Sequence, residues 1–283
     1  MKTGRIMMLV AFASMLATLC GCRHSVEPME VVSFNVRYNS WNDIDGENRW
    51  ANRRDAVVRM VEQERPAALG LQEALIDQLL YLDSCLPQYR RVGVGRDDGR
   101  EAGEFMAIYY DTTRLEVTGV DTRWLSDTPD VPSKYEGAGC FRTVTVARFR
   151  DRQSGKPFAY LNTHLDHVSN DARVRGAQVI ADIVANQLQD IPIVVGGDMN
   201  CEADSSEYAP FAFFYRAGLQ DTRTLPDSTS HRATYNAFGT EQAKVIDHFF
   251  VRGIEVLRFR TLDGDYGVPY ISDHYPIAVT IRL

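Results

Sequence analysis

The sequence predicts an α/β sandwich, in which two β-sheets are flanked by helices. Strands and helices alternate at the start of the chain and again in its last third, whereas short strands follow one another between residues 90 and 163. The chain has 283 residues, of which 45% are hydrophobic, so it can bury one sizeable core. We therefore expect one large folded domain.

The N-terminal part of this domain is predicted to alternate strand and helix. Residues 30–37 place apolar and polar side chains on alternate faces, as a strand does. Apolar side chains at helical spacing follow in residues 50–64, and Pro66 ends that helix. A second strand and a second helix are expected at residues 67–71 and 75–86. This order is typical of a layered α/β domain.

The middle of the chain changes character and predicts an antiparallel sheet. Clusters of Gly, Asp and Pro separate short segments with strand-like alternation. These segments are residues 90–95, 105–110, 115–125, 142–150 and 158–163. The sequence Ser-Gly-Lys-Pro at residues 154–157 predicts a hairpin turn between the last two.

The last third returns to helices and strands in alternation. Ser169 or Asn170 is expected to cap a helix that runs to about residue 189. Residues 191–195 form a buried strand that ends in Gly-Gly-Asp-Met-Asn. The remaining elements are expected to be a helix at 205–217 and strands at 244–252, 255–262 and 277–281.

The first residues have the features of an export signal. Lys2 and Arg5 precede an apolar run at residues 6–19, which is too short for a comfortable membrane span. The following Leu-Cys-Gly-Cys resembles a bacterial lipobox and predicts lipidation at Cys22, with plain secretion and cleavage nearby as the alternative. We expect an exported protein in the cell envelope, at the periplasmic face or the outer membrane. Three parts are predicted: a signal peptide at 1–21, a short tether at 22–29 and the folded domain at 30–283.

The charge of the chain argues against one class of function. Removing Lys2 and Arg5 with the signal changes the formal net charge from −7 to −9. Such a chain is not attracted to phosphate backbones in general, so a generic nucleic-acid binder is disfavoured. Past the lipobox only Cys85, Cys140 and Cys201 remain, and their spacing predicts neither a disulfide framework nor a zinc site of cysteines.

Charged or amide side chains end several apolar strands. They are Asn35, Glu73, His164, Asp198 with Asn200, Asp247, and Asp273 with His274. An unpaired buried carboxylate costs several kcal/mol, so a chain that repeats this feature must compensate it with a shared cation or mutual hydrogen bonds. The sequence therefore predicts one polar centre. Its oxygen ligands, with carboxylates at Glu73 and Asp273, favour Mg²⁺ or Mn²⁺ over Zn²⁺.

Seven sequence blocks carry a resemblance to a known family. They are SFNVR, LQE, GEFMAIYY, NTHLDH, GGDMN, IDHFF and SDHYPIAV, in this order. The chain resembles the endonuclease/exonuclease/phosphatase superfamily, which includes deoxyribonuclease I, over about residues 30–283. Its WLSDTP segment is similar to that of an exported bacterial subgroup without an assigned substrate. The resemblance implies a four-layer α/β sandwich with two central mixed sheets, and a catalytic domain at residues 30–283.

The resemblance also implies a metal centre and a histidine with its partner. Glu73 is expected to be the direct Mg²⁺ ligand, with Asn35 and Asp273 beside it. His274 is expected to be the general base or a phosphate-stabilising group, oriented by Asp247.

Five further residues receive roles from the same resemblance. Asp198 and Asn200 are expected to position the attacking water and a phosphate oxygen. His164 corresponds to a second catalytic histidine, and Glu104 stands where its carboxylate partner would be. Arg142 corresponds to a phosphate-contacting arginine. The implied reaction is Mg²⁺-dependent hydrolysis of a phosphate ester by in-line attack of water.

Two loops are expected to determine the choice of substrate, namely residues 38–49 and 122–134. Trp41, Trp50 and Trp124 lie in or next to them. Their rings would either stack on a base or sugar or anchor the loops on the sheet, and we favour anchoring.

Several alternatives stay open at this point. Within the phosphohydrolases they are an RNA or DNA exonuclease of the deadenylase-like branch, a phosphatase of phospholipids or inositol phosphates, and a sugar-phosphate diesterase. Asn-Thr-His-Leu-Asp-His at residues 162–167 lacks the first His of a dinuclear zinc hydrolase. A non-catalytic binding lipoprotein would be expected to lose site residues, which this chain keeps. The arginines predict a solvated rim; they are Arg49, Arg53, Arg54, Arg90, Arg91, Arg96 and Arg100. We expect a monomer.

Overall fold

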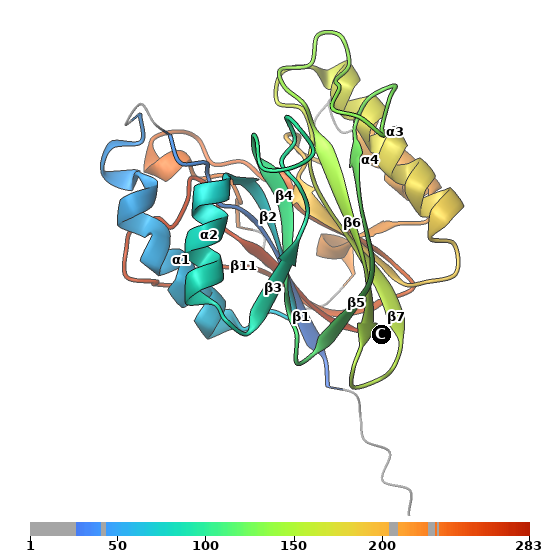
Figure 1. Cartoon of the computed structure of the whole chain (residues 1–283), viewed down its shortest axis with the longest axis horizontal. Helices are drawn as coiled ribbons and strands as arrows, with labels where there is room; N and C mark the ends of the chain where they lie inside the picture. The colour runs from blue at the N-terminus through green and yellow to red at the C-terminus, as the bar shows by residue number, and fades with distance from the viewer. Residues whose placement is uncertain (1–26, 41–43, 204–208, 226–229, 231) are drawn as a thin grey trace, which may run out of the picture.

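The protein is built in four layers, as predicted. The computed structural model describes residues 27–40, 44–203, 209–225, 230 and 232–283. Two six-stranded sheets lie face to face in the middle, and helices cover the outer face of each sheet (Figure 1). The predicted α/β sandwich with two mixed sheets is confirmed.

The first sheet combines the beginning and the end of the chain. Its order is β11 (Glu255–Thr261), β12 (Ile277–Arg282), β1 (Met29–Asn35), β2 (Ala68–Ala74), β4 (Phe105–Asp111) and β3 (Tyr89–Val92). Strand β1 pairs in parallel with β2 and antiparallel with β12. The carboxyl ends of β1 and β2 therefore lie at the same rim as the start of β12.

The second sheet is built in the same way. Its order is β5 (Leu115–Trp124), β6 (Thr143–Asp151), β7 (Pro157–His164), β8 (Ile193–Asp198), β10 (Asp247–Arg252) and β9 (Gln220–Asp221). Strand β8 pairs in parallel with β7 and antiparallel with β10. The ends of β7 and β8 thus meet the start of β10.

The helices follow the apolar periodicity of the sequence. They are α1 (Trp50–Glu64), α2 (Ile76–Cys85), α3 (Asn170–Gln187) and α4 (Ala209–Arg216), with short 3₁₀ turns η1 (Gly46–Asn48), η2 (Thr222–Thr224) and η3 (Ala237–Gly239). Helix α1 has the predicted limits and ends at Arg65 in the left-handed region, directly before Pro66. Helix α3 is capped by Ser169, whose hydroxyl accepts a hydrogen bond from the Ala172 N–H.

Three apolar cores separate the layers. The first lies between α1, α2 and the first sheet and includes Val57 and Leu71. The second lies between the second sheet and α3 with α4 and includes Ile180 and Phe250. The third fills the space between the two sheets. Each sheet is therefore buried on both faces over much of its area.

A polar contact crosses the apolar layer between the sheets. The Asn162 amide on β7 donates to the backbone oxygens of Leu71 and Ala107, at 2.8 and 2.9 Å, and both belong to the first sheet. The Gln72 amide donates to Asn162 Oδ1 at 2.6 Å. Because these groups are fully buried, the amide at position 162 fixes how the two sheets lie on each other.

The strands between residues 90 and 163 do not form one antiparallel sheet, and this prediction was wrong. Strands β3 and β4 belong to the first sheet, whereas β5, β6 and β7 belong to the second. The chain changes sheets between Asp111 and Leu115, and Leu115 is buried in the core between the sheets. Alternation of side chains identifies a strand but does not identify its pairing partner, which explains the error.

The N-terminal predictions lie outside the described residues. This applies to the signal peptide at 1–21 and to Cys22. In the part of the chain that the structure describes, no helix has the length and apolar character needed to cross a membrane. Cys85, Cys140 and Cys201 are free thiols, in agreement with the absence of a predicted disulfide framework.

We predict that Asn162→Leu lowers the free energy of unfolding by about 3 kcal/mol, because it removes three buried hydrogen bonds, two to backbone oxygens of the first sheet and one from the Gln72 amide. Urea unfolding followed by circular dichroism measures this change. Asn186→Leu on the exposed side of α3 is the matched control and should change stability by less than about 0.5 kcal/mol. Equal effects of the two variants would contradict the role given to Asn162.

Candidate active site

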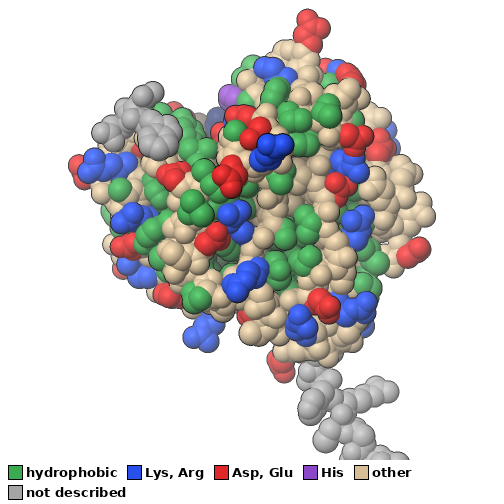
Figure 2. Space-filling model, in the orientation of Figure 1, with side chains coloured by type: hydrophobic (Ala, Val, Ile, Leu, Met, Phe, Trp, Pro, Cys, Tyr) green, Lys and Arg blue, Asp and Glu red, His purple; other side chains and the backbone are tan. Residues whose placement is uncertain are grey.

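The predicted polar residues meet at one rim of the two sheets. Strands β1, β2, β7 and β8 end there with Asn35, Glu73, His164 and Asp198. Strands β10 and β12 run the opposite way, so Asp247 at the start of β10 and the segment before β12 reach the same rim. Figure 2 shows the surface notched at the upper edge, between the lobe of α1 and α2 and the lobe of α3, with a histidine visible at the notch.

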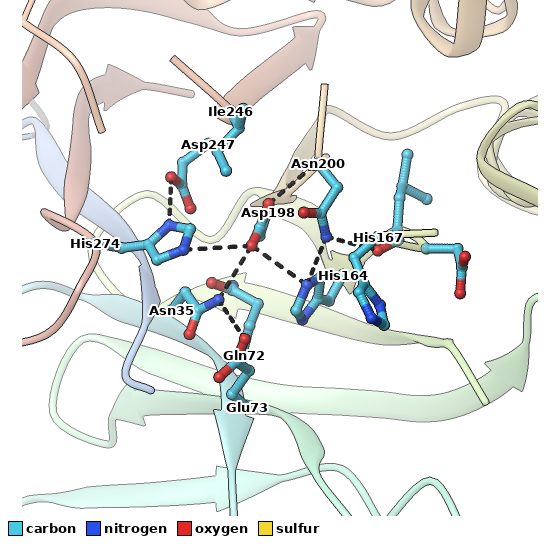
Figure 3. Close-up of polar contacts among 12 residues, drawn as sticks. Asn35, Gln72, Glu73, His164, His167, Asp198, Asn200, Ile246, Asp247 and His274 are labelled. Atoms are coloured by element: carbon cyan, nitrogen blue, oxygen red, sulfur yellow. Dashed lines mark hydrogen bonds and ion pairs between the residues drawn. The ribbon is translucent and has the colours of Figure 1, made fainter. Parts of the chain in front are cut away.

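The Asn35 amide joins the two sheets at this rim. Asn35 Nδ2 donates to Glu73 Oε1 at 2.9 Å and to Asp198 Oδ2 at 3.0 Å (Figure 3). Asn35 and Glu73 belong to the first sheet, and Asp198 belongs to the second. The Asn35 Oδ1 atom accepts the backbone N–H of Arg37 at 3.0 Å, which fixes the direction of the amide.

Glu73 leaves the regular strand because of a local irregularity. The register of β2 against β4 shifts between Leu71 and Ala74, and Glu73 has φ 61° in the left-handed region. Burial alone would raise the pKa of Glu73, but the hydrogen bond from Asn35 and the charge of Arg37 outweigh it and lower the pKa. Glu73 is therefore ionised at neutral pH.

Asp273 is the second carboxylate on the Glu73 side of the site. It is buried, its Oδ1 accepts the Ser272 hydroxyl at 3.1 Å, and its Oδ2 lies 3.8 Å from Arg37 Nη1. Burial and the nearby Glu73 carboxylate raise the pKa of Asp273, although the His274 charge opposes this. The two carboxylates thus repel each other in the absence of a cation.

His274 and Asp247 form a buried pair. The distance from His274 Nδ1 to Asp247 Oδ2 is 2.9 Å. Burial lowers the pKa of His274, but the Asp247 and Asp198 carboxylates outweigh burial and raise the pKa to about 10. His274 Nε2 lies 3.7 Å from Asp198 Oδ2 and points toward the centre of the site (Figure 3).

Asp198 is the carboxylate at the centre of the site. Besides Asn35, its neighbours are His164 Nε2 at 3.3 Å and the backbone N–H of Asn200, which donates to Asp198 Oδ1 at 2.9 Å. Burial and the Asp247 charge raise the pKa of Asp198 to about 7, although His274 opposes this. This carboxylate can therefore bind or release a proton near neutral pH.

Asn200 and His164 lie on the far side of Asp198. Asn200 has φ 50°, and its Nδ2 lies 2.8 Å from His164 Nε2 and donates to the Leu165 oxygen at 3.0 Å. Burial and the Arg142 charge lower the pKa of His164 well below its ordinary value. The imidazole is therefore neutral, and its Nε2 lies between the Asn200 amide and the Asp198 carboxylate.

Glu104 and Arg142 line the same pocket. Glu104 forms its ion pair with Arg96 and not with His164, so the expected His164–Glu104 pairing is wrong. Burial and Glu73 raise the pKa of Glu104 to about 7. Arg142 is buried, and its Nη2 lies 3.0 Å from His167 Nδ1.

Two further predictions concern residues that lie away from the pocket. Trp50 and Trp124 are both only 5% exposed, and the Trp124 indole donates to the Arg96 oxygen, which confirms that these two rings anchor the chain. Trp41 lies outside the described residues.

Arg53 does not belong to a solvated rim. It is 1% exposed, and its guanidinium donates to the oxygens of residues 36, 37, 48 and 271.

The functional residues enclose a pocket of about 560 Å³. Eight of the side chains that line it received no role from the sequence, namely Arg37, Tyr38, Cys140, His167, Tyr235, Glu241, Lys244 and Ile246. Arg37 follows Asn35 in the SFNVR block and was the one within reach of a sequence argument. Tyr235 lies in a segment without strand or helix periodicity, and Lys244 stands at the start of the strand expected at residues 244–252, so no local pattern gives either of them a role in the site.

Two groups of side chains have the composition of a metal site. In the described ranges, the ligand atoms of Asp198, Asp247 and His274 lie within 4.8 Å of one another, which is consistent with a metal centre. Cys140, Asp166 and His167 form the second group. It does not fit a cation, because Asp166 accepts three backbone N–H groups and His167 Nδ1 faces the Arg142 guanidinium.

Comparison with known proteins decides the family. The model of the endonuclease/exonuclease/phosphatase family matches residues 32–274. This chain belongs to that family. Members of the endonuclease/exonuclease/phosphatase family are metal-dependent phosphoester hydrolases.

Individual members of the family are similar over most of the chain. An endonuclease/exonuclease/phosphatase from Bacteroides vulgatus is 31% identical, with TM-score 0.84, and the match covers 90% of this chain and 99% of that one. A mannosyl-6-phosphatase from Bacteroides thetaiotaomicron is 30% identical, with TM-score 0.83 and coverage of 90% and 100%. An uncharacterized protein of Acanthamoeba polyphaga mimivirus is 26% identical over 183 residues, which are 62% of this chain and 68% of that protein.

We predict that Asp198→Asn stabilises the protein at alkaline pH. Because the pKa of Asp198 is raised to about 7, the folded state keeps this proton between about pH 4 and 7, whereas the unfolded chain has already released it. The free energy of unfolding therefore falls as the pH rises toward and through 7. Asparagine removes this loss. In EDTA at pH 8, Asp198→Asn should melt roughly 5 °C above the wild type, and this difference should shrink at pH 5.

Differential scanning calorimetry at both pH values measures this effect. Asp182→Asn on the exposed side of α3 is the matched control and should melt with the wild type. A lower melting temperature of Asp198→Asn at pH 8 would show that the carboxylate stabilises the fold.

Proposed function

We propose that this protein is an Mg²⁺-dependent phosphoester hydrolase. One observation carries the proposal: Asn35 hydrogen bonds to carboxylates from both sheets, next to the buried His274–Asp247 pair. The family match supports the same reaction class.

The residues on the first sheet would hold the metal. Glu73 and Asp273 offer carboxylate oxygens that repel each other, and a divalent cation between them would remove this repulsion. Asn35 Oδ1 accepts one hydrogen bond and keeps a second lone pair. These hard oxygen donors fit Mg²⁺, with Mn²⁺ as a substitute. When bound, the ion would polarise a phosphate oxygen and neutralise charge that develops on it.

Asp198 is suited to accept the proton of the attacking water. Its pKa of about 7 places it near the optimum for a general base at neutral pH. Asn200, whose amide lies beside His164, would hold the water or a phosphate oxygen. Water held here would attack the phosphorus in line with the leaving group.

His274 is suited to stabilise the phosphate and not to act as the base. Its pKa of about 10 keeps the imidazole charged at neutral pH, so Nε2–H can donate to a phosphate oxygen. Asp247 accepts from Nδ1 and fixes the ring. The neutral His164 would hold Asn200, and Arg142 would contact a phosphate oxygen from the opposite wall of the pocket. Glu104 would orient Arg96.

The substrate that we propose is a small phosphate monoester, such as a sugar phosphate. The pocket of about 560 Å³ is large enough for a hexose phosphate and is lined by polar groups. The formal net charge of −7 disfavours long nucleic acids. The mannosyl-6-phosphatase of Bacteroides thetaiotaomicron, 30% identical over 90% of this chain, supports this substrate class.

An exonuclease acting on RNA or DNA is the second candidate. Four basic side chains line the pocket, and they would suit a longer anionic chain as well. They are Arg37, Arg96, Arg142 and Lys244. Phospholipid and inositol-phosphate phosphatases belong to the same reaction class and are tested together with the exonuclease.

We predict that phosphate is released from mannose 6-phosphate with Mg²⁺ and not with EDTA. The panel also contains bis-p-nitrophenyl phosphate, single-stranded RNA, duplex DNA, sphingomyelin and inositol phosphates. His274→Ala should lower kcat by about 10²–10³-fold, because it removes a charged donor to the phosphate. Asp247→Asn keeps the shape of the pair but weakens its charge, and it should lower kcat less.

Asp182→Asn on the surface of α3 is the control for Asp247→Asn and should keep full activity. Release of nucleotides at a higher rate than of sugar-bound phosphate would favour the exonuclease. Equal rates for the wild type and His274→Ala would reject the site assignment.

We also propose export and lipid anchoring at Cys22, on the basis of the N-terminal sequence. In a bacterial host the protein is expected to incorporate radiolabelled palmitate and to fractionate with membranes. Cys22→Ser should lose the label, whereas the matched variant Cys20→Ser should keep it. Label that persists in Cys22→Ser would contradict anchoring at this residue.

A further inference from the structure

Thr234 contacts both chain segments that carry the His274–Asp247 pair. It is completely buried, and its hydroxyl oxygen accepts the N–H groups of Ile246 at 3.1 Å and Asp247 at 3.0 Å. Its backbone oxygen accepts the N–H of Tyr275 at 2.6 Å, directly after His274. One residue thus fixes the backbone on both sides of the pair.

The residues after Thr234 add contacts to the same segment. The backbone N–H groups of Asn236 and Ala237 donate to the backbone oxygen of Asp273 at 2.7 and 3.0 Å. The ring of Tyr235 packs edge-on against the His274 imidazole, with ring centroids 5.0 Å apart. Residues 234–237 are therefore attached to the histidine side through their backbone. They are attached to the aspartate side through backbone hydrogen bonds between residues 234–235 and Lys244 and through the Thr234 hydroxyl.

The Thr234 hydroxyl matters because it is the acceptor for the backbone N–H groups of Ile246 and Asp247. The N–H of Asp247, the first residue of β10, lies in the interior, where an unpaired donor costs free energy and the backbone shifts to find another partner. A shift at Asp247 N–H moves the carboxylate that accepts from His274 Nδ1 at 2.9 Å. We infer that Thr234 is a positioning residue, which holds Asp247 in place against His274. This inference rests on the proposed function only where activity is measured.

Thr234→Val and Thr234→Ser are the variants that test this role. Valine keeps the shape of threonine and removes the acceptor, whereas serine keeps the acceptor. Thr234→Val is expected to lower kcat on the order of 100-fold, as for a small misplacement of a catalytic group, with KM changed less than about threefold. Thr234→Ser should stay within about threefold of the wild type.

A second measurement does not depend on activity. Because the Asp247 carboxylate only accepts, the His274 Nδ1 proton lies in this hydrogen bond and should give a low-field proton resonance in histidine-labelled protein. His274→Ala identifies the resonance by its loss. Thr234→Ser should keep the resonance, and Thr234→Val should shift it upfield or lose it.

Thr145→Val is the matched control. Thr145 is equally buried on β6, and its hydroxyl contacts Thr122 and no group of the pair. It should keep both kcat and the resonance.

If Thr234→Val does not fold, Thr234→Ala, which leaves room for a water at the two N–H groups, is measured in its place. An unchanged resonance in the Thr234 variant that lacks the hydroxyl would overturn the inference, even if activity falls. If the wild type hydrolyses no phosphate ester, the resonance still decides the role of Thr234.

Discussion

The Asn35 amide is the contact on which the geometry of the site depends. Its two N–H groups reach Glu73 on one sheet and Asp198 on the other, at 2.9 and 3.0 Å. The apolar core between the sheets has no preferred direction, because hydrophobic contact is not directional. Asn35 at the rim and Asn162 deeper between the sheets supply that direction. The hydrogen bonds of both asparagines thus fix the position of one sheet relative to the other.

This alignment brings together groups that destabilise one another. Burial and neighbouring carboxylates raise the pKa of Asp198, Asp273 and Glu104, so the folded chain holds protons that the unfolded chain would release. Such crowding is common where function requires shifted pKa values. The apolar cores on both faces of each sheet provide the stability that offsets it.

Much of the fold follows from local sequence patterns. The apolar spacing of α1 and the Pro after it define that helix, and the capping Ser169 defines the start of α3. The ends of buried strands indicated the polar centre, because Asn35 and Asp198 are poorly suited to a core unless they have partners. In each case the signal lies within a few residues of the element that it predicts.

What the sequence did not show depends on contacts between distant residues. The strands before and after Leu115 read alike, but they pair in different sheets. Glu104 was expected to be the carboxylate partner of His164, yet it is paired with Arg96, eight positions upstream. Arg53 looked like a surface cation and is buried, because four backbone oxygens surround its guanidinium. Such partners are known only once the chain is folded.

The direction of β1 has a consequence for how an anchored molecule would face its surroundings. The strand begins at Met29 and reaches the rim of the candidate site at Asn35, about 20 Å further on at the rise of an extended chain. A lipid at Cys22 would hold the opposite end of the sandwich against the bilayer. The mouth of the pocket would then open toward the aqueous side, where it meets dissolved esters and not the headgroups of its own leaflet.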